Sequence, residues 1–253
     1  VRTPIVRPST SIEIWLGPSD DRWIDQDRFE RDSYGNVVAS LDPLGARHEV
    51  GFDAASHTHP VVERFVLAGG LLEDRAVWDP SLGTLLEYQD ANGEVTTYRY
   101  DGLGRVVTAA EPGDSDASPT IAYRYDLGAP LSVVTTERRI QSGAPETLVS
   151  RTFVDGLRRA RGRLEQVDAT RWTLTGYVGL NACGQVRDKY HGSFVDGTAL
   201  PDTAPAVPFE RQVFDAAGRP VASQHPDGSA SFVEYGPLEA RAHDEEDADP
   251  ASP

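Results

Sequence analysis

The sequence predicts an all-β chain, an array of short antiparallel strands and hairpins that forms a curved sheet. A turn motif returns at intervals of 21 to 29 residues along much of the chain. Stretches that alternate between apolar and polar residues separate the turns, as expected of half-buried strands. No segment keeps a helical period, because Pro and Gly interrupt most windows longer than about twelve residues.

The repeated unit is an aromatic or apolar residue, then Asp, two or three small residues, Gly, often Arg, and a β-branched pair. Two copies are clear, at Tyr100, Asp101, Gly104 and Arg105 and at Phe214, Asp215, Gly218 and Arg219. Looser copies contain Trp78, Asp79 and Gly83; Tyr125, Asp126 and Gly128; and Val154, Asp155, Gly156 and Arg159. Further copies begin at Asp32 and Asp53, and a decayed one lies within residues 177–186.

Each position of the unit has a physical role. The Asp carboxylate accepts hydrogen bonds from backbone N–H groups two residues on and so closes a turn. The Gly adopts a positive φ, where a Cβ would clash, and the β-branched pair suits a pleated surface. The repeated arginines, Arg105, Arg159 and Arg219, are expected to pair with the turn carboxylate or to cover neighbouring aromatic rings.

A second turn signal falls between these copies. Asp42-Pro43-Leu44-Gly45, Asn92-Gly93 and Pro226-Asp227-Gly228 each precede an alternating stretch that ends on an aromatic residue. Asn-Gly and Asp-Gly between alternating segments are strong hairpin signals. Each period therefore comprises two strands and two turns, and neighbouring units must share a core and a ladder.

The chain is expected to divide into three segments. Residues 1–28 form a leading strand or linker, residues 29–236 form the repeat array, and residues 237–253 form an acidic, Pro-containing connection or tail. The chain opens at Val1 and holds no methionine, which indicates a piece of a longer protein.

The two clear copies resemble the Tyr-Asp (YD) repeat of the RHS and teneurin superfamily, over roughly Phe29 to Tyr235. Residues 171–173, 176–185, 187–194 and 232–247 are similar to the YD-repeat region of the B component of bacterial ABC-type (Tc) insecticidal toxin complexes. In that family, YD strands of the B and C components form a hollow β-shell around the toxic C-terminal region of the C component. The resemblance implies a non-catalytic wall segment that is secreted or at the cell surface. Its implied partners are the remaining YD segments and a C-component-like partner or toxin cargo.

Two departures limit the resemblance. The related RHS core ends in a self-cleaving Asp-Pro-x-Gly-Leu motif, whereas Asp42-Pro43-Leu44-Gly45 is followed by Ala46 and lies near the start. Proteolysis is therefore not carried over to it. The β-propeller of the family has no counterpart in 253 residues, so a chain of this length forms a partial shell.

Composition excludes several function classes. With 40 Asp and Glu against 24 Lys and Arg, the formal net charge is −16, which argues against nucleic-acid binding and against docking on an anionic membrane. The longest apolar run, residues 65–72, is too short to insert into a bilayer. The single cysteine, Cys183, excludes a disulfide framework and is expected to be a small packing residue.

Alternative functions rest on weaker patterns. His57 and His59, with Glu63 nearby, would suit zinc, although Ser56 and Pro60 favour a solvated loop. The acids of the turns would suit calcium, and the acid pairs would suit a glycosidase, at Asp20 and Asp21 or at Asp25 and Asp27. We expect no cofactor and no catalysis. An extracellular adhesion or carbohydrate-binding module is the second hypothesis, and a hydrolase on a β-scaffold is the third.

Overall fold

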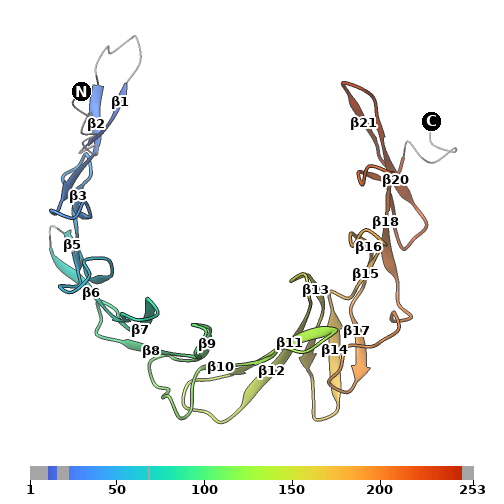
Figure 1. Ribbon diagram of the computed structural model, residues 1–253, viewed down its shortest axis with the longest axis horizontal. Helices are drawn as coiled ribbons and strands as arrows, with labels where there is room; N and C mark the ends of the chain where they lie inside the picture. Colours follow the sequence, from blue (N-terminus) through green and yellow to red (C-terminus); the bar gives the residue numbers. More distant parts are fainter. Residues whose placement is uncertain (1–10, 16–22, 68, 247–253) are drawn as a thin grey trace. The chain divides into compact units, whose positions relative to one another are not determined.

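A computed structural model describes residues 11–15, 23–67 and 69–246. All of the regular structure in this part of the chain is β-strand, from β1 to β21, so the predicted all-β fold is confirmed (Figure 1). No helix among these residues is long and apolar enough to cross a membrane. The chain divides into two compact units, residues 1–120 and 121–253.

Unit 1 is a meander in which each strand pairs antiparallel with the next one along the chain. Its strands are β1 (Ser11–Trp15), β2 (Trp23–Arg31), β3 (Val37–Leu41), β4 (Arg47–Phe52), β5 (Pro60–Leu67), β6 (Gly70–Asp79), β7 (Thr84–Gln89), β8 (Val95–Tyr100) and β9 (Val106–Ala110).

The two-strand period places every second turn at the same edge of this meander. The turns that follow β2, β4, β6 and β8 begin at Asp32, Asp53, Asp79 and Asp101. Because successive strands are antiparallel, these four turns lie at the same end of the strands. We call this row of strand ends the repeat edge of unit 1. The turns that begin at Asp42 and Asp90 lie at the opposite edge.

Unit 2 contains two ladders. The first has the order β10-β11-β12-β13-β14-β17 and the second the order β15-β16-β18-β19-β20-β21. The strands are β10 (Ile121–Asp126), β11 (Leu131–Arg139), β12 (Thr147–Asp155), β13 (Ala160–Gln166), β14 (Arg171–Thr175), β15 (Val178–Leu180), β16 (Val186–Tyr190), β17 (Ser193–Asp196), β18 (Phe209–Phe214), β19 (Pro220–Gln224), β20 (Ala230–Tyr235) and β21 (Ala240–His243).

The hydrophobic core cluster lies in unit 2. Phe153, Leu164, Trp172, Leu174 and Tyr177 are buried and in contact, on strands β12 to β14 and the turn after them. The segment after β17 packs onto this cluster through Leu200, whose Cδ1 would lie 2.6 Å from a Cβ added at Gly162. Gly162 therefore provides the space in which the chain crosses back over its own sheet.

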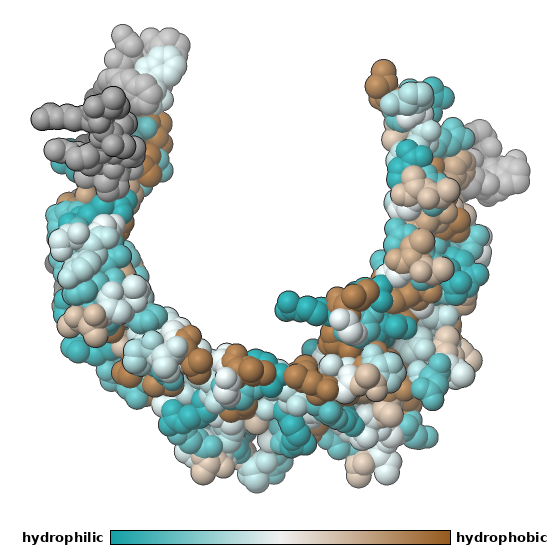
Figure 2. All heavy atoms as spheres, in the orientation of Figure 1, coloured by the Kyte–Doolittle hydropathy of each residue, from teal (hydrophilic) through white to brown (hydrophobic). Residues whose placement is uncertain are grey.

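Unit 1 buries far less. Its buried apolar residues among those described are alanines, namely Ala39, Ala109 and Ala110, and most other strand residues are half-buried. Polar and apolar side chains are interspersed over the surface that is visible in Figure 2. Such a sheet depends on its ladder and its turns more than on a core.

The paired strands extend beyond residues 29–236 in both directions. Ser11–Trp15 and Trp23–Arg31 pair as β1 and β2, so the boundary expected at residue 28 falls inside a strand. Ala240–His243 pairs with β20, so the ladder continues past residue 236, where a connection or tail was expected. The reason is a further turn, in which the Gly236 N–H donates to the Glu239 carbonyl at 2.9 Å.

Truncation of Leu164 should destabilise unit 2 strongly, since its side chain is 0% exposed. We expect Leu164→Ala to lower the free energy of unfolding by about 2–5 kcal/mol through lost contacts and a residual cavity. The matched control is Leu157→Ala, at a leucine that is 73% exposed, with an expected change within about 0.5 kcal/mol. Urea unfolding measures both, and equal midpoints for the two variants would contradict the assigned core.

Candidate functional site

The recurrent structure is a turn closed by one carboxylate. At Asp101, Oδ1 accepts hydrogen bonds from the N–H groups of Leu103 at 2.9 Å and of Arg105 at 3.0 Å. The Asp101 N–H donates to the Arg105 carbonyl at 2.9 Å, and the Gly104 N–H donates to the Asp101 carbonyl at 3.0 Å. Gly104 has φ 74°, a conformation that glycine adopts without strain.

The second carboxylate oxygen binds the repeated arginine. Arg105 Nε donates to Asp101 Oδ2 at 2.7 Å, and the same contact at 2.7 Å joins Arg159 to Asp155 and Arg219 to Asp215. The prediction that these arginines pair with their turn carboxylates is thereby confirmed. Arg219 also lies over the Tyr235 ring, with its guanidinium carbon 4.4 Å from the ring centroid.

These donors lower the pKa of each carboxyl group. The Arg105 side chain and then its backbone N–H lower the pKa of Asp101, and the backbone N–H of Arg219 is the main cause at Asp215. At Asp155, burial raises the pKa, but the hydrogen bonds from the Arg159 backbone and side chain outweigh it. The carboxylates of the turns are therefore held in their ionised form, as acceptors.

The looser copies follow this plan to different extents. Asp79 Oδ1 accepts the Ser81 N–H at 2.8 Å, and Gly83 has φ 65°. In the Asp155 turn, the positive φ, 64°, belongs to Arg158 and not to Gly156, so the glycine of this copy was misplaced. The exposed Arg158 therefore holds a backbone conformation that usually requires glycine.

The copy at Tyr125 and Asp126 does not form this turn, which corrects the expectation from sequence. Gly128 does not adopt a positive φ, and the Ala129–Pro130 peptide bond is cis. In the turns at Asp101, Asp155 and Asp215 the residue four after Asp donates its N–H to the carboxylate. Here that residue is Pro130, which has no N–H to donate.

Two of the three signals between the repeats, at Asp42 and Asp90, form the same turn, and sequence reasoning missed this. The third turn begins at His225, whose carbonyl accepts the Gly228 N–H at 3.0 Å. The Oδ1 atom of the first residue accepts the N–H groups two and four residues on at Asp32, Asp42, Asp90 and Asn181. Asn92-Gly93 is therefore the second half of a turn that begins at Asp90, and not a two-residue hairpin. An Asp three residues before a Gly was the signal that would have found the turns at Asp42 and Asp90.

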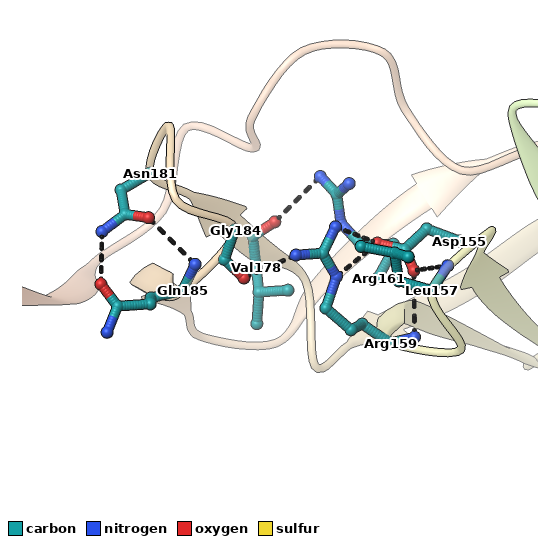
Figure 3. Close-up of polar contacts among 8 residues, drawn as sticks. All are labelled: Asp155, Leu157, Arg159, Arg161, Val178, Asn181, Gly184 and Gln185. Carbon is teal, nitrogen blue, oxygen red and sulfur yellow. Dashed lines mark hydrogen bonds and ion pairs between the residues drawn. The ribbon is translucent and has the colours of Figure 1, made fainter. Parts of the chain in front are cut away.

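Consecutive turns in unit 2 are bonded to one another. Arg159 Nη1 donates to the Gly184 carbonyl at 2.6 Å, and Gln185 Nε2 donates to the Gly218 carbonyl at 2.8 Å. Figure 3 shows the first of these links, from the Asp155 turn to the turn that Asn181 closes. A Cβ added at Gly184 would lie 2.1 Å from Arg159 Nη1, so this glycine also makes room for the incoming guanidinium.

The repeat edge of unit 1 shows a related link. Asn36 Nδ2 donates to the His57 carbonyl at 2.7 Å, and the Tyr34 and His57 rings stack with centroids 3.9 Å apart. Both contacts join the turn that begins at Asp32 to the one that begins at Asp53. Adjacent turns of one edge therefore hold each other in place in both units.

The aromatic residue before Asp links its strand to the preceding one. Tyr100 OH donates to the Leu85 carbonyl at 2.8 Å, and Trp78 Nε1 donates to the Pro60 carbonyl at 2.7 Å. Tyr235 precedes Gly236 and not an Asp, but its OH likewise donates to the Pro220 carbonyl of the preceding strand at 3.0 Å. The aromatic ring thus packs on the strand pair while its polar atom satisfies a backbone acceptor.

Other predicted sites resolve differently. The His57 and His59 rings stack on different residues, Tyr34 and Trp78, and the part of the chain that the structure describes holds no group of three His, Cys, Asp or Glu suited to a metal. Cys183 is exposed, so the expectation that it packs inside is wrong, because it lies at the tip of the Asn181 turn. Asp20 and Asp21 lie outside the described residues, and the side chain of Asp25 is likewise not described.

The family model described as RHS Repeat matches residues 78–116. This stretch runs from Trp78 and Asp79 through Tyr100 and Asp101, two of the copies identified by their turn chemistry. The predicted resemblance to YD-repeat proteins of the RHS group is confirmed. A comparison with curated proteins gives no match.

Solved structures of toxin complexes share the fold. The crystal structure of TcdB2–TccC3 has a TM-score of 0.69 at 16% identity, covering 94% of this chain and 15% of that chain. The Tc holotoxin pore of Photorhabdus luminescens has a TM-score of 0.74 at 14% identity, covering 97% of this chain and 16% of that chain. The form of TcdB2–TccC3 without its hypervariable C-terminal region scores 0.67 at 14% identity. The chain thus has the fold of these proteins and spans about a sixth of their length.

Replacement of Arg158 by glycine should stabilise unit 2. The left-handed backbone of Arg158 carries strain that glycine lacks, and its side chain makes no hydrogen bond or ion pair within the described chain. We expect Arg158→Gly to raise the free energy of unfolding by about 1 kcal/mol after allowance for the greater entropy of unfolded glycine. Arg158→Ala keeps the Cβ and serves as control. A gain with alanine as large as with glycine would contradict the strain.

The carboxylate of Asp101 should be replaceable in part by an amide. Asn retains one acceptor oxygen for the N–H groups of Leu103 and Arg105, whereas Ala retains none. We therefore expect the thermal midpoint of Asp101→Asn to lie between that of the parent and that of Asp101→Ala. Equal midpoints for the two variants would show that the oxygen does not close the turn.

The turn carboxylates should also make the fold sensitive to acid. Since the folded pKa of Asp101, Asp155 and Asp215 lies below the ordinary value of 3.8, their stabilisation is complete above that pH. It is lost as the pH falls through the folded pKa values. Unfolding midpoints measured between about pH 7 and pH 2 should fall steeply below about pH 4, and less steeply in Asp101→Asn.

Proposed function

We propose that the chain is a wall segment of a toxin-complex shell, similar to the B component, and that it encloses a polypeptide rather than performing chemistry. The observation that carries this proposal is the common fold with TcdB2–TccC3, over 94% of the chain. The turn chemistry supports it, because the turns fit strand pairs together into an extensible array.

The hydrogen bonds made by the repeated carboxylates favour a structural role. At Asp101, Asp155 and Asp215, one oxygen binds two backbone N–H groups and the other binds arginine. A general acid must carry a proton near neutral pH, whereas these carboxyl groups have lowered pKa values. The acids that recur along the chain thus close turns.

The proposed partners are further YD-repeat segments of the same protein and a C-component-like partner or toxin cargo. β1 and β21 end their ladders in the described part of the chain, and each presents a strand edge to which another strand can add. As in the toxin complexes of similar fold, the assembled protein would act outside the producing cell, secreted or at the surface.

Protection of an enclosed chain tests the proposal. The full-length protein that contains these residues is co-expressed with a C-component-like protein, and the purified complex is treated with protease. We expect the two to copurify and the variable C-terminal region of the partner to resist digestion until the complex is denatured. Digestion at the rate of the isolated partner would overturn the shell role. Saturable binding to a glycan array would instead favour the adhesion module.

A further inference from the structure

One face of unit 2 carries a cavity that the turn chemistry does not use. It has a volume of about 480 Å³ and lies over strands β10 to β13. Its polar and charged lining includes Tyr123, Thr136, Arg138, Ser150, Arg163 and Glu165. A volume of this order is within the range of ligand sites in proteins.

The strand register arranges the lining in rows. Tyr123 is opposite Thr136, Thr136 is opposite Ser150, and Ser150 is opposite Glu165, which gives a polar row across four strands. In the next row, Arg138 lies between Ile121 and Leu148. Because alternate residues of a strand share a face, both rows face the cavity together.

The cavity has a surplus of positive charge in an acidic protein. Arg163 is engaged, with Nε 3.0 Å from Glu165 Oε1 and Nη2 donating to Ser150 Oγ at 3.3 Å. Arg138 forms no hydrogen bond or ion pair within the described residues, although acids outnumber bases 40 to 24. Two guanidinium groups therefore face one carboxylate, and one guanidinium is available.

We propose that this cavity binds an acidic side chain of a second polypeptide, with Arg138 pairing with its carboxylate. A guanidinium binds a carboxylate through two parallel hydrogen bonds, and the hydroxyl row beside it offers further donors. Ile121 and Leu148, on either side of Arg138, can pack against the methylene groups of a Glu side chain. The site stands on its own geometry and does not depend on the shell role.

Titration of the purified protein with short peptides tests this site. The probe is a peptide with two adjacent Glu residues, measured by calorimetry at low salt, and its counterpart carries Gln at both positions. We expect the Glu peptide to bind, the Gln peptide to bind at least about tenfold more weakly, and binding of the Glu peptide to weaken as salt is added. Equal binding of the two peptides would overturn the proposal.

Matched variants assign the binding to Arg138. Arg138→Gln should weaken the Glu peptide about tenfold while leaving the thermal midpoint nearly unchanged, because Arg138 forms no hydrogen bond or ion pair within the described residues. Arg124→Gln removes the same charge from β10, where Arg124 pairs with Glu137 on the opposite face, and should leave binding unchanged. Equal losses in the two variants would indicate a general charge effect and contradict the site. Binding of inorganic phosphate with no binding of the Glu peptide would likewise contradict a polypeptide ligand.

Discussion

The structure depends on a carboxylate oxygen that accepts two backbone N–H groups across a four-residue turn. The same arrangement closes turns at Asp32, Asp42, Asp90, Asp101, Asp155 and Asp215. The chain reverses direction while most of the polar groups of the turn are hydrogen-bonded. Further strands can therefore be added with few backbone N–H groups left without an acceptor. It also helps to explain the acidic composition, since many of the acids serve as acceptors in turns.

The two units differ in how much of their stability comes from a buried core and how much from contacts between strands and turns. Unit 2 has a buried cluster around Leu164 and Trp172, covered by the segment that carries Leu200. In unit 1 the buried apolar residues, among those described, are alanines, so most of its side chains remain partly solvated. Its strands are held by ladder hydrogen bonds, by aromatic residues such as Tyr100 that bond to the preceding strand, and by contacts between adjacent turns. Such stability is distributed and repeats along the array.

Residues that recur with the repeat and residues that do not recur differ in what they bind. The residues that recur with the repeat stabilise the turns of the sheet, and their carboxylates are already hydrogen-bonded to backbone N–H groups and, at Asp101, Asp155 and Asp215, paired with arginine. Residues that do not recur, such as Arg138, are free to differ from one strand pair to the next. A repeat array of this kind can therefore keep a constant frame while the residues on its faces vary, as those that line the cavity over β10 to β13 do.

The sequence by itself determined the all-β class and the two-strand period, and it gave pairing with the turn carboxylate as one of two roles for Arg105, Arg159 and Arg219. These features are local, because the bonded groups lie within five residues and spacing alone specifies them. It did not reveal that Arg158 takes the position of glycine, or that Pro130 prevents the turn at Asp126. Only the tertiary structure decided which turns are in contact, that β17 pairs with β14 out of sequence order, and which side chains form the cavity. Those contacts join residues far apart in the chain, and strand register sets them.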